Sequence, residues 1–139
     1  AIGLVQMKRY PSMLQRRKEI IEQYDAALSK EGIEVLNHYD NDHRSSGHLY
    51  ITRIPNISLE QRQAIIEQMA ECGIATNVHY KPLPMMTAYK NLGFDIANFP
   101  NAYARFANEI TLPLHTKLTS EEIEYIIDNY IRITKQFMQ

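Results

Sequence analysis

The sequence lacks several features that would place it in a particular class. Its 139 residues include a single cysteine, Cys72, so the chain cannot form an internal disulfide. No apolar run approaches the roughly 20 residues that a membrane-spanning helix requires, and no secretory signal is present. A formal net charge of -1 gives no electrostatic reason to expect a nucleic acid or an anionic membrane as partner. We therefore expect a cytoplasmic protein with neither partner, in which Cys72 is a buried, unreactive thiol.

The common catalytic motifs are missing as well. The sequence has no glycine-rich phosphate loop, no nucleophile elbow, no serine–histidine arrangement with a supporting spacing, and no recognisable pair of catalytic carboxylates. We therefore expect binding chemistry without a catalytic residue in this chain. A length of 139 residues, 45% of them hydrophobic, suits one domain with one core.

The first third of the sequence is predicted to be helical. Apolar residues recur at helical spacing after Pro11, which suits a first helical turn, and continue to a glycine stop at Gly32. The opening "AIGLVQMKRY" already has Ile2 and Val5 at helical spacing, with no cap and no turn before them. We interpret this opening as the interior of a helix, in a chain cut from a longer protein.

Two capping boxes predict the start of further helices. Ser58 with Gln61 precedes an apolar face that ends at Gly73, and Thr119 with Glu122 precedes another at the end of the sequence. Shorter helices are predicted at 85–93 and 101–109, and strands at 33–39, 48–54, 74–80 and 110–114. This order predicts an α+β sandwich of two layers, with a small sheet covered by helices mainly on one side.

The segment "TNVHYKPLPMMTAYKNLGF", at 76–94, is the main candidate for a site. The alternation along the predicted strand places His79 at the strand's end, where ligand-binding groups often gather. His79 can exchange hydrogen bonds, Tyr80 can present a hydroxyl, and Lys81 can meet an anionic group such as a phosphate. The alternative interpretation is a structural turn, in which the backbone satisfies His79 and Tyr80 packs.

The polar loop "HYDNDHRSSGH" is a second candidate. Its three histidines and two aspartates could suggest a metal site, but the spacing matches no standard zinc pattern and no paired cysteines support it. We predict a solvated loop without metal, in which Arg44 could contact an anionic ligand.

Five segments, read in order, resemble parts of one enzyme family. They are "AIGLVQM", "RRKEIIEQYDAAL", "GHLYITRI", "ECGIATNVHYKPLPMMTAY" and "FPNAYARFANEITLPLHTKLTSEEIEYII". Together they resemble the C-terminal domain of the DegT/DnrJ/EryC1/StrS family, pyridoxal-phosphate-dependent aminotransferases that act on nucleotide-linked keto sugars. The resemblance spans essentially the whole chain, and the order of the segments makes it specific.

The resemblance implies a fold, a domain division and a cofactor. The fold would be that of the small domain of fold-type I pyridoxal-phosphate-dependent transferases, with a mostly antiparallel sheet. Residues 1–32 would form a helical connector and 33–139 the small domain. Pyridoxal phosphate, its lysine and most phosphate contacts would belong to a large N-terminal domain, so this chain would hold no catalytic or cofactor-binding residue and would be inactive alone.

The resemblance also implies a reaction and partners. An amino donor, expected to be glutamate, leaves its amine on the cofactor, and the keto sugar then collects it. His79 and Tyr80 match the family's histidine–tyrosine pair near the substrate, whereas "KPLPM" after them departs from the commoner proline–leucine–histidine ending. The intact enzyme would be a homodimer in cell-surface polysaccharide or related sugar biosynthesis. The alternative, from a different class, is an independent small α+β module for ligand binding or dimerisation.

Overall fold

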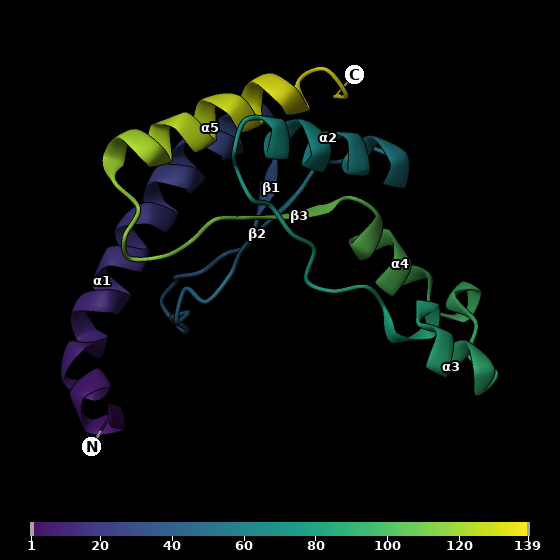
Figure 1. Cartoon of the computed structure of the whole chain (residues 1–139), viewed down its shortest axis with the longest axis horizontal. Coiled ribbons are helices and arrows are strands. Elements are labelled where there is room, and N and C mark those ends of the chain that lie inside the picture. Colours follow the sequence, from purple (N-terminus) through teal and green to yellow (C-terminus); the bar gives the residue numbers. More distant parts are fainter. Residues whose placement is uncertain (1, 139) are drawn as a thin grey trace.

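The computed structural model describes residues 2–138 and forms three antiparallel strands covered by helices (Figure 1). The helices are α1 (Ile2–Leu28), α2 (Leu59–Glu71), α3 (Thr87–Asn91), α4 (Pro100–Ala107) and α5 (Ser120–Thr134), and the strands are β1 (Glu34–Val35), β2 (Tyr50–Arg53) and β3 (Glu109–Leu112). Short 3-10 helices occur at Ser29–Glu31, Leu83–Met85 and Ile96–Asn98. Within residues 2–138, no helix has the combination of length and apolar character that crossing a membrane requires.

The strands lie side by side in the order β1, β2, β3, and every pairing is antiparallel. Tyr50 and Thr52 of β2 are buried beneath the helices, while the alternate residues Ile51 and Arg53 point to the other face. Directly opposite residues share a face, so Ile51 and Arg53 lie beside their β3 partners Thr111 and Glu109. The sheet therefore has one covered face and one open face.

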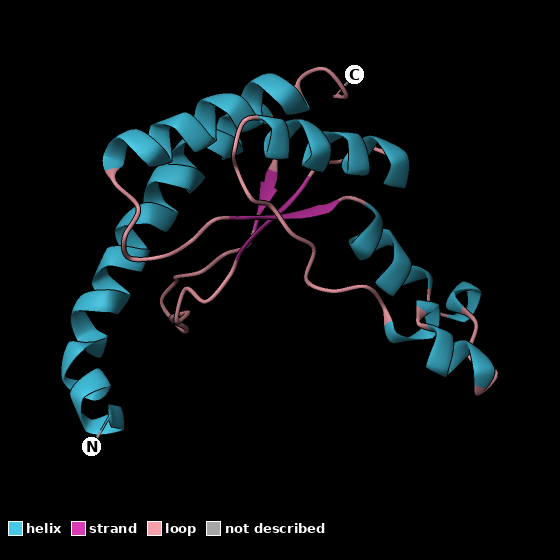
Figure 2. Cartoon of the chain, in the orientation of Figure 1, coloured by secondary structure: helices cyan, strands magenta, loops and turns pink. Residues whose placement is uncertain are grey.

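Helices α2 and α5 and the second half of α1 pack against the covered face, above the strands in Figure 2. The rings of Tyr24 on α1 and Tyr50 on β2 lie 4.7 Å apart. The hydroxyl of Thr52 donates to the carbonyl oxygen of Ile110 at 2.7 Å, and the Tyr130 hydroxyl of α5 lies 2.6 Å from the Thr52 oxygen. Because the Thr52 proton is used in the first bond, Tyr130 is the donor in the second.

Two arms extend from this body. One is the first half of α1, and the other carries α3 and α4; Figure 1 shows them on opposite sides of the molecule. Both arms expose large apolar side chains, which on α1 are Ile2, Leu4, Val5, Met7 and Tyr10. The core is instead built around the second half of α1, where Ile20, Ile21, Tyr24 and Leu28 are fully buried.

The helix signals in the sequence are largely confirmed. Both capping boxes form, at Ser58 with Gln61 and at Thr119 with Glu122. Gly32 and Gly73 follow the predicted helices with φ of 76° and 74°. The α+β class, the antiparallel sheet and the placement of helices on one side are confirmed too.

The opening of the sequence is helical from Ile2, as predicted, but the start of a separate helix predicted at Pro11 is wrong. Pro11 lies inside α1, which runs without interruption from Ile2 to Leu28. Proline removes one backbone hydrogen bond from a helix interior, and here it does so in an exposed turn, where water can bond to the carbonyl left free. Cys72 is half-buried rather than buried, and the Arg132 guanidinium lies 3.5 Å from its sulfur.

Two predicted strands are shorter than expected. The strand predicted at 33–39 is reduced to β1, and the one predicted at 74–80 to a single bridge between Asn77 and Thr111. The ladder stops after Asn77 because side chains take over the next bonds. The Val78 N–H donates to the Asn77 side chain at 2.8 Å, and the His79 N–H donates to the Glu109 carboxylate.

Candidate functional site

A cavity of about 300 Å³ lies at the open face of the sheet, between the strands and the arm that carries α4. Ile51 and Arg53 of β2 and Glu109 of β3 form its floor, and His79 and Tyr80 line it from the segment that follows the Asn77 bridge. Helix α4 contributes a second cation, Arg105, and the buried ring of Phe106. The cavity therefore combines an imidazole, a phenol, a carboxylate, apolar surface and two guanidinium groups, of which that of Arg53 pairs with Glu34 at 2.9 Å.

His79 is held in this cavity by contacts to β3. Its backbone N–H donates to both carboxylate oxygens of Glu109, each at 3.1 Å, and its ring nitrogen Nδ1 lies 2.9 Å from the Thr111 hydroxyl. Two backbone bonds between Asn77 and Thr111, of 3.1 and 2.8 Å, fix the preceding residues to the same strand. Contacts of its backbone, its ring and the preceding residues thus fix His79 to β3. His79 is also part of the cavity wall.

Tyr80 and Lys81 are less constrained than His79. The Tyr80 ring packs edge-on against the His79 ring with centroids 4.7 Å apart, and it is 71% exposed. The peptide bond between His79 and Tyr80 is cis. Lys81 is exposed next to the cavity but does not line it. The structure therefore brings His79 and Tyr80 together and leaves Lys81 outside.

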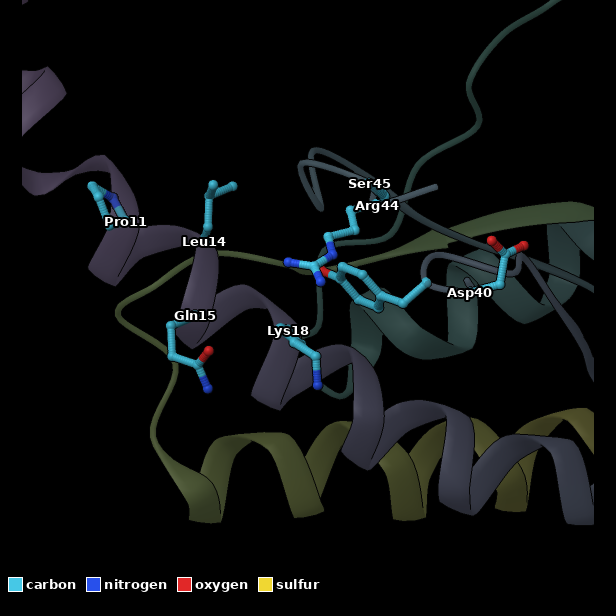
Figure 3. A pocket seen from close by; sticks show the side chains of 8 residues that line it. Pro11, Leu14, Gln15, Lys18, Asp40, Arg44 and Ser45 are labelled. Atoms are coloured by element: carbon cyan, nitrogen blue, oxygen red, sulfur yellow. The ribbon is translucent and has the colours of Figure 1, made fainter. Parts of the chain in front are cut away.

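Arg44 lies in a different place, at a cavity of about 580 Å³ between α1 and the loop that joins β1 to β2. Figure 3 shows the residues that line this cavity, with Gln15 and Lys18 on α1 and Asp40 and Arg44 on the loop. Lys18 pairs with Glu22 on its own helix and lies 5.6 Å from the centroid of the Tyr39 ring. Arg44, by contrast, has no ion pair among residues 2–138.

The same loop lies against α1 at Gly47, where φ is 59°. A Cβ atom at this position would come within 3.1 Å of both the Arg17 Cβ and the Ile21 Cδ1 atoms. The Nη1 atom of Arg17 also donates to the carbonyl oxygen of Ser46 at 3.3 Å. Glycine is therefore favoured here, both for the left-handed backbone and for the close approach of the loop to the helix.

The histidines of this loop have separate environments. Exposed His43 pairs through Nδ1 with Asp40 at 2.7 Å, and its other ring nitrogen bonds to the Asn37 carbonyl; that bond, with the Asp40 charge, raises the pKa of His43. Buried His38 instead stacks on Tyr50 with an interplanar angle of 9°, and burial lowers its pKa. Within the described residues, no group of three histidine, cysteine or acidic side chains could hold a metal ion.

Asp25 faces the same stack from α1. It accepts a hydrogen bond of 2.7 Å from the Tyr50 hydroxyl, yet burial raises the pKa of its carboxyl group. The Nε2 atom of His38 is buried and has no hydrogen-bond partner among residues 2–138. This cluster joins the loop to the helix, and it lies beneath the covered face rather than at the His79 cavity.

Several residues of the His79 cavity were not predicted from the sequence. Arg53, Arg105 and Glu109 line it, and Thr111 bonds the His79 ring. The sequence pattern indicated only a strand for the segment "ITR" and only the end of a helix for Glu109. Their roles depend on pairing between strands more than 50 residues apart in the chain, such as Arg53 with Glu109, and no local pattern reports such a pairing.

Comparisons with known proteins agree over nearly the whole chain. The sequence model of the DegT/DnrJ/EryC1/StrS aminotransferase family matches residues 1–130. The chain is 28% identical over 138 residues to the spore coat polysaccharide biosynthesis protein SpsC of Bacillus subtilis, covering 97% of this chain and 36% of SpsC. It is 29% identical over 137 residues to the UDP-4-amino-4,6-dideoxy-N-acetyl-beta-L-altrosamine transaminase of Helicobacter pylori, covering 99% and 36% of the two chains.

Solved structures give the same result. The chain superposes on the PLP form of Spr1654 from Streptococcus pneumoniae, assigned as a sugar aminotransferase, with a TM-score of 0.95 and 55% identity, covering 99% of this chain and 35% of the other. The corresponding values for Helicobacter pylori PseC, an aminotransferase involved in pseudaminic acid biosynthesis, are 0.87 and 29%, with coverage of 97% and 36%. The chain thus spans about a third of the length of the relatives that it matches.

Proposed function

The chain belongs to the DegT/DnrJ/EryC1/StrS aminotransferase family, and we propose that it forms the substrate-side part of an enzyme that transfers an amino group to a nucleotide-linked keto sugar. The observation that carries this proposal is the match, over 99% of the chain, to a transaminase of a UDP-linked amino sugar. The His79 cavity supports it, because its imidazole, phenol and two guanidinium groups suit a ligand that has both hydroxyl groups and phosphates.

Pyridoxal phosphate is the cofactor that the family requires, and residues 2–138 do not by themselves fit it. The cofactor needs a lysine amine in a closed site. Lys18, at the cavity next to α1, is paired with Glu22, and Lys81 is exposed outside the His79 cavity. We propose that the cofactor, its lysine and the amino donor, glutamate, are bound by the rest of an intact homodimeric enzyme, and that this chain alone does not transaminate.

The roles proposed for this chain are binding and orientation. His79 would exchange a hydrogen bond with the sugar, and Tyr80 would cover one side of it. The phosphates of the nucleotide would be met by Arg105, with Lys81 beside the cavity and Arg44 at the second cavity adding positive charge. Holding the sugar in a fixed orientation is itself a contribution to the rate, because it removes motion that the transition state cannot have.

The proposed division of the chain takes α1 as the connector, although the burial of α1 changes halfway along the helix. Residues 1–32 would connect the small domain, 33–139, to the rest of the enzyme. The exposed apolar residues of the first half of α1 would contact that part, while the second half of the helix packs in the core described above. The setting would be cell-surface polysaccharide or related sugar biosynthesis in the cytoplasm.

The test uses the intact enzyme with pyridoxal phosphate, L-glutamate and a UDP-linked 4-keto-6-deoxy sugar, with formation of the amino sugar measured by mass spectrometry. We expect turnover, and we expect His79→Ala to reduce it by at least about tenfold, as loss of a positioned hydrogen bond does, with little change in melting temperature. His115→Ala is the matched control, because His115 is exposed and does not line the His79 cavity.

Two results would contradict the proposal. One is amino-sugar formation by the 139-residue chain without the rest of the enzyme. The other is an intact enzyme that binds the cofactor but aminates none of the UDP- and dTDP-linked keto sugars offered, which would favour the binding-module alternative.

A further inference from the structure

Glu109 and Thr111 are polar residues whose side chains lie on the face of the sheet that α1, α2 and α5 leave open. Both are nevertheless buried, next to His79. Each is only 5% exposed, and both belong to β3 beside His79. A buried carboxylate is costly unless hydrogen bonds compensate for the lost water. Here both carboxylate oxygens of Glu109 accept hydrogen bonds, and these bonds compensate for the lost contact with water.

The Glu109 carboxylate accepts three hydrogen bonds. Two come from the His79 backbone N–H, which is shared between both oxygens at 3.1 Å. The third comes from the Thr111 hydroxyl, at 2.8 Å from Oε1. Thr111 is the donor in this third bond, so its proton points at Glu109.

This direction determines the protonation of the His79 ring. The Thr111 hydroxyl has one proton, and it donates that proton to Glu109. In the 2.9 Å contact with His79 Nδ1, the Thr111 oxygen can therefore only accept. Nδ1 therefore carries a proton. In a neutral imidazole the second nitrogen, Nε2, is then an acceptor, and it has no hydrogen-bond partner among residues 2–138.

We propose that Glu109 and Thr111 are positioning residues that hold His79 as the Nδ1–H tautomer, so that Nε2 presents a lone pair to the bound ligand. The group that meets Nε2 is then a hydrogen-bond donor, namely a hydroxyl group or an N–H of the sugar. An anionic phosphate oxygen has no proton to offer and is excluded from this contact, so it is directed to the Arg105 guanidinium of the same cavity, since that of Arg53 is paired with Glu34.

This inference deepens the proposed function and rests on it for the identity of the ligand, but the tautomer itself can be tested without any ligand. The intact enzyme is labelled with ¹⁵N in its histidine rings, and long-range ¹H–¹⁵N correlations report which ring nitrogen is protonated. His79 is assigned by the signal that disappears in His79→Gln. We expect the Nδ1–H pattern in the wild type and its loss in Thr111→Val, which keeps the side-chain shape but removes the hydroxyl.

A matched control separates positioning from a general loss of structure. Thr134→Val makes the same change on α5, where, among residues 2–138, the Thr134 hydroxyl bonds only to carbonyl oxygens of its own helix. We expect this variant to retain the wild-type His79 pattern. Thr111→Ser restores a hydroxyl and should restore the pattern as well.

Kinetics with the UDP-linked keto sugar give the second readout. We expect Thr111→Val to raise the KM for the sugar by about tenfold, the size of one lost hydrogen bond, with recovery in Thr111→Ser. A similar rise is expected in Glu109→Gln, whose amide can donate as well as accept and so no longer fixes the direction of the Thr111 proton.

The outcomes distinguish this inference from the proposed function. An Nε2–H pattern for His79 in the wild type, or an unchanged Nδ1–H pattern in Thr111→Val, overturns the inference even if the enzyme aminates sugars. Absence of sugar turnover with the expected Nδ1–H pattern overturns the proposed function and leaves the positioning roles of Glu109 and Thr111 standing.

Discussion

The guanidinium carbon of Arg62 lies 4.5 Å from the centroid of the Phe106 ring, and Nη1 of the same side chain donates to the Phe106 carbonyl oxygen. Arg62 is on α2, in the body of the molecule, and Phe106 is on α4, in the arm that borders the His79 cavity. This buried contact therefore fixes the position of one wall of the cavity relative to the sheet.

Replacing Arg62 by methionine keeps the apolar stem and removes the donor. We expect the free energy of unfolding to fall by about 2 kcal/mol, because a buried carbonyl loses a charged partner. Urea unfolding followed by circular dichroism measures this change. Gln63→Met on the exposed side of the same helix should change the value by less than about 0.5 kcal/mol. Equal losses of unfolding free energy in both variants would show that the contact between Arg62 and α4 does not contribute to stability.

A second prediction concerns the bond between Thr52 and Tyr130 that joins β2 to α5. Tyr130→Phe should cost about 1 kcal/mol, since it removes one buried hydrogen bond. In a double-mutant cycle with Thr52→Val, the two losses should not add, with a coupling energy of about 1 kcal/mol. Additive losses would mean that the 2.6 Å contact contributes nothing to stability.

The elements that the sequence predicted well are those with local signals. Ser58 and Thr119 form their capping boxes with residues three positions later, so the signal and the structure lie in the same stretch of chain. The strand predicted at 74–80 depended instead on how many bonds it could make to a distant strand. His79 does not form a strand hydrogen bond, because its N–H donates instead to the side chain of Glu109, 30 residues away.

The candidate site shows the same division. His79 and Tyr80 were singled out from their place at the end of a predicted strand and from the resemblance of their neighbours to a family motif, and both line the cavity. Arg53, paired across the sheet with Glu109, had no such motif, and neither did Thr111 beneath the imidazole. These partners become visible only when the register of β2 and β3 is known. The roles assigned to His79, Tyr80, Lys81 and Arg44 stay predictions until the variants are measured.

The third prediction concerns pH. Burial lowers the pKa of His38 from its ordinary value of 6.5. The charge of Asp25 opposes this shift of the pKa, and the charge of His43 adds to it. As the pH falls through about 6.5, the unfolded chain therefore binds this proton before the folded chain does, and stability decreases.

His38→Phe keeps a ring against Tyr50 and removes the titrating group. We expect its free energy of unfolding to decrease less than that of the wild type between about pH 7.5 and pH 5.5. His43 and Asp25 are present in both proteins, so the difference reports on His38. A comparison at about pH 8, where His38 is neutral in both states, corrects for altered packing. Parallel curves would contradict a buried, neutral His38.

The fourth prediction compares two glycines with similar backbones. Gly47 and Gly73 have φ of 59° and 74°, but only at Gly47 would a Cβ atom meet other side chains. Gly73→Ala should cost about 1 kcal/mol, the strain of a left-handed residue. Gly47→Ala should cost about 2 to 3 kcal/mol, because steric overlap with α1 is added to that strain. Similar losses in thermal unfolding would show that the loop can retreat from the helix without cost.

The close approach at Gly47 has a consequence for the cavity that Arg44 lines. Gly47 contributes no surface to that cavity, yet it determines how near the loop with Asp40 and Arg44 comes to α1. A substitution that changes the size of this cavity can therefore lie at a position that does not line it.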